Sequence, residues 1–309
     1  MKAIVYADRR GDELLPLTGK TPVALLPVIG KPVLEHTLED LAEAGVRSVL
    51  LVVRAEARDA FATLGAGERW GLNLKTIIAA PDETPTDAAR RCAGLLPDTF
   101  LALRGDVMRG RVVRDFLAAS SNVLAAKVVA EIQGRAAQLC LSRKRDVQLD
   151  GLHWSEGSLD RAAGRWRTRE LGNVGLARLT GVTDYYLANM DALDRCFAGL
   201  APAGRQIQAG VFAGQDAEVT AESVRDGMAV FGAKCHVPSD TELHGPLVIG
   251  DGAVIGAGVF MHACVVMPGA SVPEGTRLSN AVVTSDMAIG LDGRMLVRFT
   301  DLLAESNAA

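Results

Sequence analysis

Short apolar runs and one amphipathic segment open the chain in a pattern typical of an α/β protein. Residues 3–7 form an apolar run that predicts a strand, and residues 46–53 predict a second one. Between them, leucines recur at helical spacing over residues 34–41. This order predicts a right-handed βαβ unit, whose ligands lie beyond the carboxyl ends of the strands. The polar, glycine-containing loop of residues 8–13 is therefore where we expect a phosphate group.

The alternation of apolar and polar segments continues to about Pro202. Strands are expected at residues 74–79, 99–103, 125–130 and 137–141, with a helix of mixed charge at residues 55–64. Glycines and a proline then mark a linker, so we place one α/β domain at residues 1–202.

A different periodicity governs the rest of the chain, in which aliphatic residues recur every six positions. One column is Val237, Leu243, Ile249, Ile255 and Met261, and a second is Val248, Val254, Phe260, Val266 and Val272. Glycines stand at the expected corners between these short segments. Each six-residue step is interpreted as one face of a coil, so stacked coils form a parallel β-helix over residues 203–309.

Composition narrows the class of protein. The chain has 309 residues, of which 49% are hydrophobic, which is enough for a large core in two domains. A net charge of −4 gives no reason to expect nucleic acid as a partner. No apolar run is long enough to span a bilayer and no signal segment precedes the first strand, so we expect no membrane insertion and a cytoplasmic location. The five scattered cysteines indicate reduced thiols.

A long frame of residues near the N-terminus resembles the sugar-nucleotide pyrophosphorylases, of the mannose-1-phosphate guanylyltransferase and glucose-1-phosphate thymidylyltransferase kind. The frame is Pro16-Leu17-Thr18, Pro22, Leu26-Pro27-Val28, Gly30-Lys31-Pro32, Glu35-His36 and Ala44-Gly45. These enzymes join a nucleoside triphosphate to a sugar 1-phosphate. The resemblance implies a Rossmann-like, GT-A-like nucleotidyltransferase fold, with a mixed sheet and helices on both faces. The tail resembles the left-handed parallel β-helix of hexapeptide-repeat proteins.

The phosphate-binding positions of that family are filled differently in this chain. The family's loop is Gly-x-Gly-Thr-Arg, and its positions align with Arg9 for the first glycine, Gly11 for the second and Glu13 for the arginine. The lysine that holds the sugar phosphate aligns with Val23. A carboxylate about 4 Å from a phosphate charge costs roughly 4 kcal/mol at an effective dielectric near 20, where an arginine would gain a similar amount. Arg9 and Arg10 compensate in part if they turn inward, so Arg9, Arg10 and Gly11 are nucleotide-binding candidates.

A further loop of the chain bears on recognition of the nucleotide base. The family's base-contacting Gly-Thr aligns with Pro85 and Thr86, so Thr86 is a further nucleotide-binding candidate. The same loop also suits a capped helix start with Thr84 or Thr86 at the N-cap.

The resemblance implies metal binding by Asp106, which follows a buried strand in Arg104-Gly105-Asp106. The second metal-binding aspartate aligns with Arg178, ahead of a helix implied at residues 183–193. If the protein is active, Mg²⁺ is the expected cofactor; otherwise none is expected.

Three functions remain open. The leading hypothesis is a degenerate, non-catalytic pyrophosphorylase homologue with a scaffold or regulatory role in sugar-nucleotide or exopolysaccharide biosynthesis, binding a nucleotide, a sugar phosphate or a polysaccharide-synthesis protein. In that hypothesis Glu13, Val23 and Arg178 are vestigial positions, and the tail joins copies into a homo-oligomer. The first alternative is an active nucleotidyltransferase in which Arg9, Arg10 and Asp106 take over the lost roles. The second is a hexapeptide acyltransferase that uses His236, His244 or His262 as a base.

Overall fold

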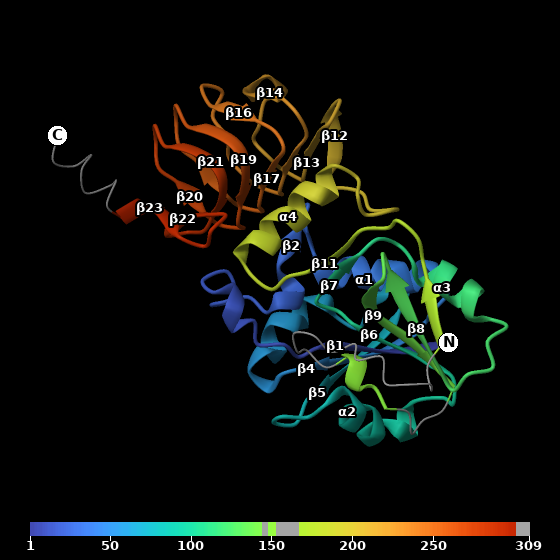
Figure 1. The fold of residues 1–309 in the computed structure, drawn as a ribbon. Helices are drawn as coiled ribbons and strands as arrows, with labels where there is room; N and C mark the ends of the chain where they lie inside the picture. The colour runs from blue at the N-terminus through green and yellow to red at the C-terminus, as the bar shows by residue number, and fades with distance from the viewer. Residues whose placement is uncertain (144–147, 153–166, 301–309) are drawn as a thin grey trace.

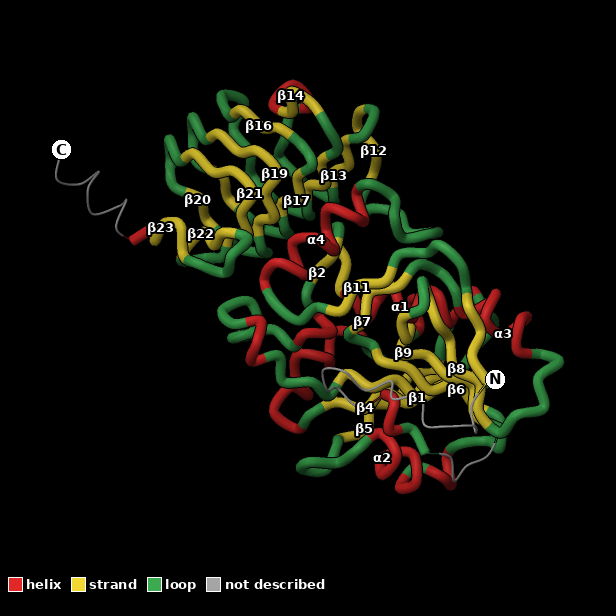
Figure 2. Tube along the Cα trace, in the orientation of Figure 1, coloured by secondary structure: helices red, strands yellow, loops and turns green. Residues whose placement is uncertain are grey.

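A mixed sheet lies at the centre of the N-terminal part of the computed structural model, which describes residues 1–143, 148–152 and 167–300 (Figures 1 and 2). Among those residues, seven strands are ordered β10-β8-β9-β6-β1-β4-β5. Their bounds are Lys2–Ala7 (β1), Ser48–Val53 (β4), Asn73–Ile78 (β5), Phe100–Arg104 (β6), Lys127–Ile132 (β8), Arg135–Ser142 (β9) and Arg167–Glu170 (β10). β1 runs parallel to β4 and β6, β4 to β5 and β10 to β8, whereas β9 is antiparallel to β6 and β8. The predicted strands and the mixed, mostly parallel sheet are confirmed.

Helices cover both faces of this sheet because both faces of its central strand are apolar. Ala3 and Val5 of β1 pack in one core with α1 (Val33–Glu43) and α3 (Val113–Ser120). The alternate residues Ile4 and Tyr6 pack in another core with α2 (Pro85–Arg91). A strand buried on both sides needs the continuous apolar run that the sequence shows.

Of two local predictions on this part of the chain, one differs from the structure in detail and one is confirmed. Residues Ala55–Leu64 form a 3₁₀ helix, so that segment is helical with a tighter turn than the α-helix. Helix α2 begins as the capped start that the sequence predicts: the Thr84 hydroxyl accepts a hydrogen bond from Asp87 N, and Pro85 occupies the first helical position.

The C-terminal part of the chain consists of short strands in three parallel stacks. The first stack joins β13 (Val211–Ala213), β15 (Ala229–Phe231), β17 (Leu247–Ile249), β19 (Phe260–Val266) and β21 (Arg277–Val283). The second joins β14 (Val224–Asp226) and β16 (Glu242–His244) to β19, and the third joins β18 (Val254–Ile255) to β20 (Ser271–Val272). Antiparallel strands lie at either end: β12 (Arg205–Gln208), β22 (Met287–Gly290) and β23 (Met295–Arg298). The left-handed β-helix stays a prediction.

The first predicted aliphatic column is confirmed, and the second is wrong in part. Every member of the Val237 to Met261 column is buried. In the second column, Val254 is 46% exposed, and Val266 lies in the inner core instead. Val266 lies inside because the repeat length changes. Phe231 pairs with Ile249, 18 residues on, but Ile249 pairs with Val266, only 17 residues on. A repeat of strictly six therefore loses its register after Phe260.

Helix α4 (Val182–Leu193) joins the two parts of the chain (Figure 1). It confirms the helix implied at residues 183–193. Tyr185 and Tyr186 pack with the outward-facing valines Val248 and Val265 of the first strand stack. The Tyr186 hydroxyl donates to the Ala263 carbonyl over 3.1 Å. No helix in the described ranges is both long and apolar enough to cross a membrane.

Candidate functional site

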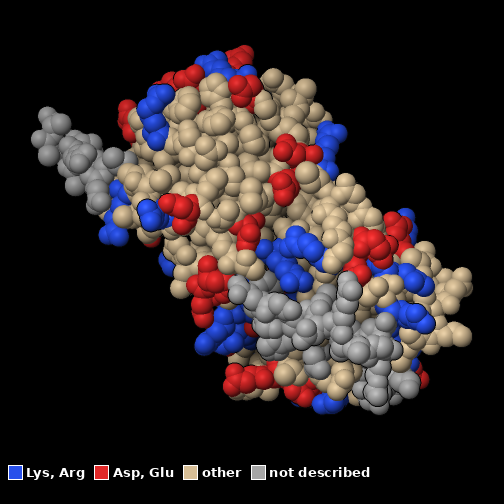
Figure 3. Space-filling view, viewed as in Figure 1, with Lys and Arg blue, Asp and Glu red and all other residues tan. Residues whose placement is uncertain are grey.

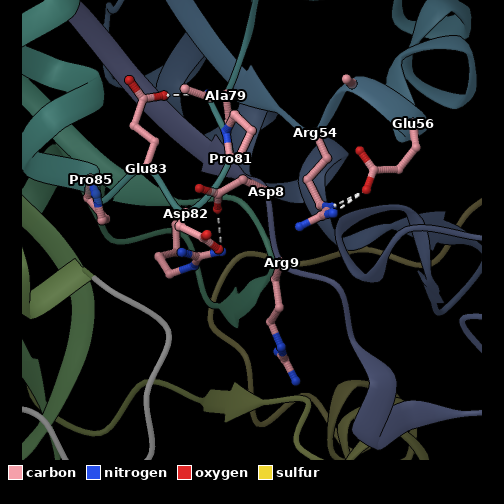
Figure 4. Close-up of a pocket in the computed structure, with 12 residues that line it drawn as sticks. Asp8, Arg9, Arg54, Glu56, Ala79, Pro81, Asp82, Glu83 and Pro85 are labelled. Atoms are coloured by element: carbon pink, nitrogen blue, oxygen red, sulfur yellow. Dashed lines mark hydrogen bonds and ion pairs between the residues drawn. The ribbon is translucent and has the colours of Figure 1, made fainter.

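A pocket of about 410 Å³ opens where four parallel strands of the central sheet end (Figure 4). It is lined by residues that follow β1, β4 and β5 and by the last residue of β6: Asp8, Arg9, Arg54, Ala55, Glu56, Ala79, Ala80, Pro81, Asp82, Glu83, Pro85 and Arg104. The chain reverses its winding direction here, because β4 and β5 lie on one side of β1 and β6 lies on the other. Open α/β sheets bind their ligands at such a point. The loop after β1 therefore lies where the sequence predicts a ligand site.

The two arginines of this loop point in different directions. Arg10 is exposed, whereas the Arg9 side chain is only 3% exposed and turns inward. Arg9 Nε donates to Glu13 Oε1 over 2.7 Å, and Arg9 Nη2 donates to the same oxygen and to the Leu179 carbonyl. Burial lowers the pKa of Arg9, while Asp106 and Glu13 oppose that shift. The inward turn neutralises Glu13, so this carboxylate is not the isolated negative charge that the sequence suggests.

The other aligned phosphate positions have become part of the core. Gly11 has a φ of 79°, and a Cβ added there would lie 2.2 Å from Cγ2 of Val23. Val23 itself is 1% exposed and packs with Leu14 and Leu26. The valine thus fills the space beside the glycine and presents no polar group to a ligand.

Asp106 follows β6 as predicted, and its carboxylate is already paired. Arg104 Nε donates to Asp106 Oδ1 over 2.7 Å, and Arg104 Nη2 donates to Asp106 Oδ2 over 2.9 Å. Arg104 Nη2 also donates to Asp8 Oδ1 over 3.0 Å. Burial alone would lower the pKa of Arg104, but the two carboxylates raise it above its ordinary value. Asp106 is 0% exposed and is not among the residues that line the pocket.

This arrangement is a poor fit for the magnesium ion that the resemblance implies. Both Asp106 oxygens accept from Arg104, and Arg9 Nη1 lies 4.0 Å from Asp106 Oδ2. The second aspartate position is Arg178, which donates to the Ala136 carbonyl and whose pKa is lowered by burial and by Arg135. In the described ranges, no three His, Cys, Asp or Glu side chains are grouped to hold a metal ion. A divalent cation about 4 Å from one guanidinium is opposed by roughly 8 kcal/mol at an effective dielectric near 20.

The remaining candidates lie away from this centre. Thr86 is 4% exposed, lies in the first turn of α2, and accepts a hydrogen bond from Leu149 N over 2.8 Å. In the strand stacks, His236 pairs with Glu218 and His244 pairs with Asp226. His262 lies beside His244 in the next strand of the second stack, whereas His236 belongs to the third stack. The three histidines therefore do not form one site.

Sequence reasoning missed Arg104 and Asp8, the two partners that complete the Asp106 cluster. The signal for Arg104 was present, because an arginine at the end of an apolar strand is buried only when it is paired. Asp8 follows β1, and β1 and β6 are adjacent in the sheet. Adjacent parallel strands bring their carboxyl ends together, so the pairing follows from the strand order.

A test of the loop's charge is the Glu13→Ala substitution. Glu13 is 37% exposed, so its loss should change the free energy of unfolding by less than about 1 kcal/mol. Its removal takes away one of the two carboxylates near Arg9, the other being Asp106, and the affinity for a nucleoside triphosphate should rise by about tenfold. Calorimetric titration with ATP measures this change. Asp12→Ala, an exposed acid in the same turn, is the control and should have less effect. A weaker triphosphate affinity in Glu13→Ala would contradict the charge argument.

Comparison with known proteins agrees with this architecture. Residues 2–133 match the model of the nucleotidyl transferase family. The chain is 29% identical over 204 residues to a CMP-5'-(3-aminopropyl)phosphonate synthase of Streptomyces rubellomurinus, covering 64% of this chain and 32% of that protein. It is 36% identical over 120 residues to a glucose-1-phosphate thymidylyltransferase of Streptomyces griseus, covering 37% of this chain and 33% of that one.

Two further similarities complete the comparison. A mannose-1-phosphate guanylyltransferase of Mycobacterium tuberculosis is 32% identical over 109 residues, which are 35% of this chain and 30% of that protein. The matched segments thus span about a third of the length of these three relatives. A crystal structure titled as a glucose-1-phosphate thymidylyltransferase from Bacillus anthracis covers 65% of this chain and 98% of its own, with a TM-score of 0.53 and 16% identity, a likeness of fold. Residues 2–133 therefore match a nucleotidyl transferase domain, and the chain is similar to proteins named as sugar-1-phosphate nucleotidyltransferases.

Proposed function

We propose that the chain is a non-catalytic homologue of the sugar-1-phosphate nucleotidyltransferases, with a scaffold or regulatory role in sugar-nucleotide or exopolysaccharide biosynthesis. The observation that carries this proposal is the ion pair between Arg104 and Asp106. Phosphoryl transfer depends on cations placed around the phosphates, and here the carboxylate at the centre accepts from the chain's own arginine.

The lining of the pocket supports the same conclusion. Its acidic members are Asp8, Glu56, Asp82 and Glu83, and its basic members are Arg9, Arg54 and Arg104. Each of the three arginines is hydrogen-bonded to a carboxylate of the chain. A triphosphate would have to displace these carboxylates to reach the guanidinium groups. The pocket therefore offers a triphosphate little net attraction.

The C-terminal part has its own role in the proposal. We propose a domain boundary near Pro202 and a left-handed parallel β-helix over residues 203–309, which joins copies of the chain into a homo-oligomer. The three parallel strand stacks support the β-helix. On the face drawn in Figure 3, the surface of these stacks is mostly uncharged, which suits a contact with another copy or with a polysaccharide-synthesis protein.

The test is release of pyrophosphate by the purified protein, measured with Mg²⁺ across the common nucleoside triphosphates and several sugar 1-phosphates. A heat-denatured sample gives the background rate, and a cooperative unfolding transition measured beforehand by circular dichroism shows that the protein is folded. The proposal expects no release above background for any pair. Turnover that disappears in Asp106→Asn would reject it.

The first alternative, an active nucleotidyltransferase with a divergent site, keeps one observation in its favour. The pocket lies at the switch point of the sheet and has room for part of a nucleotide. This alternative predicts turnover in the same assay, with losses in Asp106→Asn and in Arg9→Ala. The proposed function expects both variants to match the wild type.

A further inference from the structure

Arg104 and Asp106 form a bidentate ion pair that leaves little room for another cation. Two nearly parallel N–H···O bonds join the planar guanidinium to the planar carboxylate, at 2.7 and 2.9 Å. The side chains of Arg104 and Asp106 are 2% and 1% exposed. Both carboxylate oxygens are therefore used, in the geometry that an arginine satisfies best.

The rest of the Arg104 guanidinium is held as firmly. Nη2 donates to Asp8 Oδ1 over 3.0 Å, and Nη1 donates to the Leu152 carbonyl over 3.2 Å. All three nitrogens of the group thus have partners from three separate segments of the chain. A group fixed at every nitrogen cannot swing away without breaking several charge-assisted hydrogen bonds.

Asp8 connects the buried pair of Arg104 and Asp106 to the pocket. It is 16% exposed, lines the pocket after β1, and shares Arg104 with the buried Asp106. If the guanidinium were absent, two carboxylates would face the vacated space, with access to water through the pocket. Carboxylate and water oxygens are the ligands that Mg²⁺ and Mn²⁺ accept.

We propose that Arg104 is a resident cation that takes the place of a divalent metal ion at Asp106. The wild-type centre then binds neither Mg²⁺ nor Mn²⁺, and removal of the guanidinium creates a metal site between Asp106 and Asp8. This inference deepens the proposed function and rests on it only in treating Asp106 as the position of the family's metal ion. The experiment that tests it measures metal binding, so its result does not depend on whether the protein catalyses turnover.

The experiment compares melting temperatures in EDTA and in millimolar MgCl₂ or MnCl₂. The wild type should melt at the same temperature in all three solutions. Arg104→Met keeps an unbranched apolar stem without the guanidinium group and its charge, and its melting temperature should rise by about 5 °C with either metal. The double variant Arg104→Met/Asp106→Asn lacks the created site and should not respond.

Arg109→Met is the matched control for loss of a buried arginine. Arg109 belongs to β7 (Val107–Arg109), is 6% exposed, and donates to the carbonyls of Ala137 and Arg104. Its removal leaves the pairing of Asp106 intact, so no metal response is expected. Arg104→Lys retains a cation and should also be silent. Arg104→Gln, which lacks the charge, serves in place of Arg104→Met if that variant does not fold.

The possible results of these measurements distinguish the resident cation from the proposed function. A metal response of the wild type or of Arg104→Lys that Asp106→Asn removes would overturn the proposal, as would a folded Arg104→Met that ignores both metals. Turnover by a wild type that shows no metal response would reject the proposed function and leave the resident cation standing. If the wild type shows no turnover but does show a metal response that depends on Asp106, the resident cation is rejected and the proposed function is kept.

Discussion

Arg104→Met should lower the free energy of unfolding by about 3 to 5 kcal/mol in the presence of EDTA. The substitution leaves Asp106, which is 0% exposed, without its bidentate partner. A buried carboxylate that loses its partner keeps the whole cost of its desolvation. Urea denaturation followed by circular dichroism measures the loss. A change of less than about 1 kcal/mol would show that the pair contributes as little as a surface ion pair.

Adding Asp106→Asn to Arg104→Met separates the effect of the unpaired Asp106 charge on stability from the effect of lost Arg104 packing. In Arg104→Met/Asp106→Asn the uncompensated charge at position 106 is gone, so we expect the double variant to regain at least about 1 kcal/mol over Arg104→Met. Asp106→Asn alone leaves Arg104 paired with Asp8 and should be less harmful than Arg104→Met. Strictly additive effects of the two substitutions would contradict the direct coupling seen in the structure.

Gly232→Ala should cost about 3 kcal/mol, through overpacking of the strand stacks. A Cβ at Gly232 would lie 2.3 Å from Asp251 N, in the backbone of the next turn of the chain. Gly214 and Gly250, 18 residues to either side, face the following turn in the same way, at 2.5 Å from Ala233 N and Pro268 N. Neighbouring strands of a sheet lie about 4.8 Å apart, so the turns would have to separate to admit the methyl group.

Gly252→Ala is the control for this substitution. Gly252 has a φ of 64° and no atom within 4 Å of its added Cβ, so an alanine there meets backbone strain but no collision. Its expected cost is about 1 kcal/mol. Urea denaturation of the two variants compares them directly. Equal losses would mean that the turns can move apart freely and that the close approach at Gly232 is unimportant.

The sheet could be predicted because its signals are local. A strand buried on both faces must be apolar, and residues 3–7, 49–53 and 100–103 of β1, β4 and β6 satisfy that requirement. Helix α1 follows from the 3.6-residue spacing of its leucines. The strand stacks were visible as a six-residue repeat, until one missing residue between Ile249 and Val266 shifted the register. A single deletion of this kind has no local signature in the sequence.

The site was only partly predictable, since its chemistry depends on which loops meet. Alignment placed Glu13, Val23 and Arg178 at positions that usually bind phosphate or metal. It could not show that Arg9 turns inward to neutralise Glu13, because that choice depends on Asp106 and the Leu179 carbonyl. Nor could it show that Arg104 reaches both Asp8 and Asp106.

The most direct test of the resident cation is an electron paramagnetic resonance titration of the wild-type protein with Mn²⁺, which counts the ions that leave the free aquo form. Arg104 already supplies the positive charge at Asp106. We therefore predict that all of the added Mn²⁺ remains free, both without and with a nucleoside triphosphate once its own Mn²⁺ binding is subtracted. One ion bound per chain, and lost in Asp106→Asn, would contradict the claim.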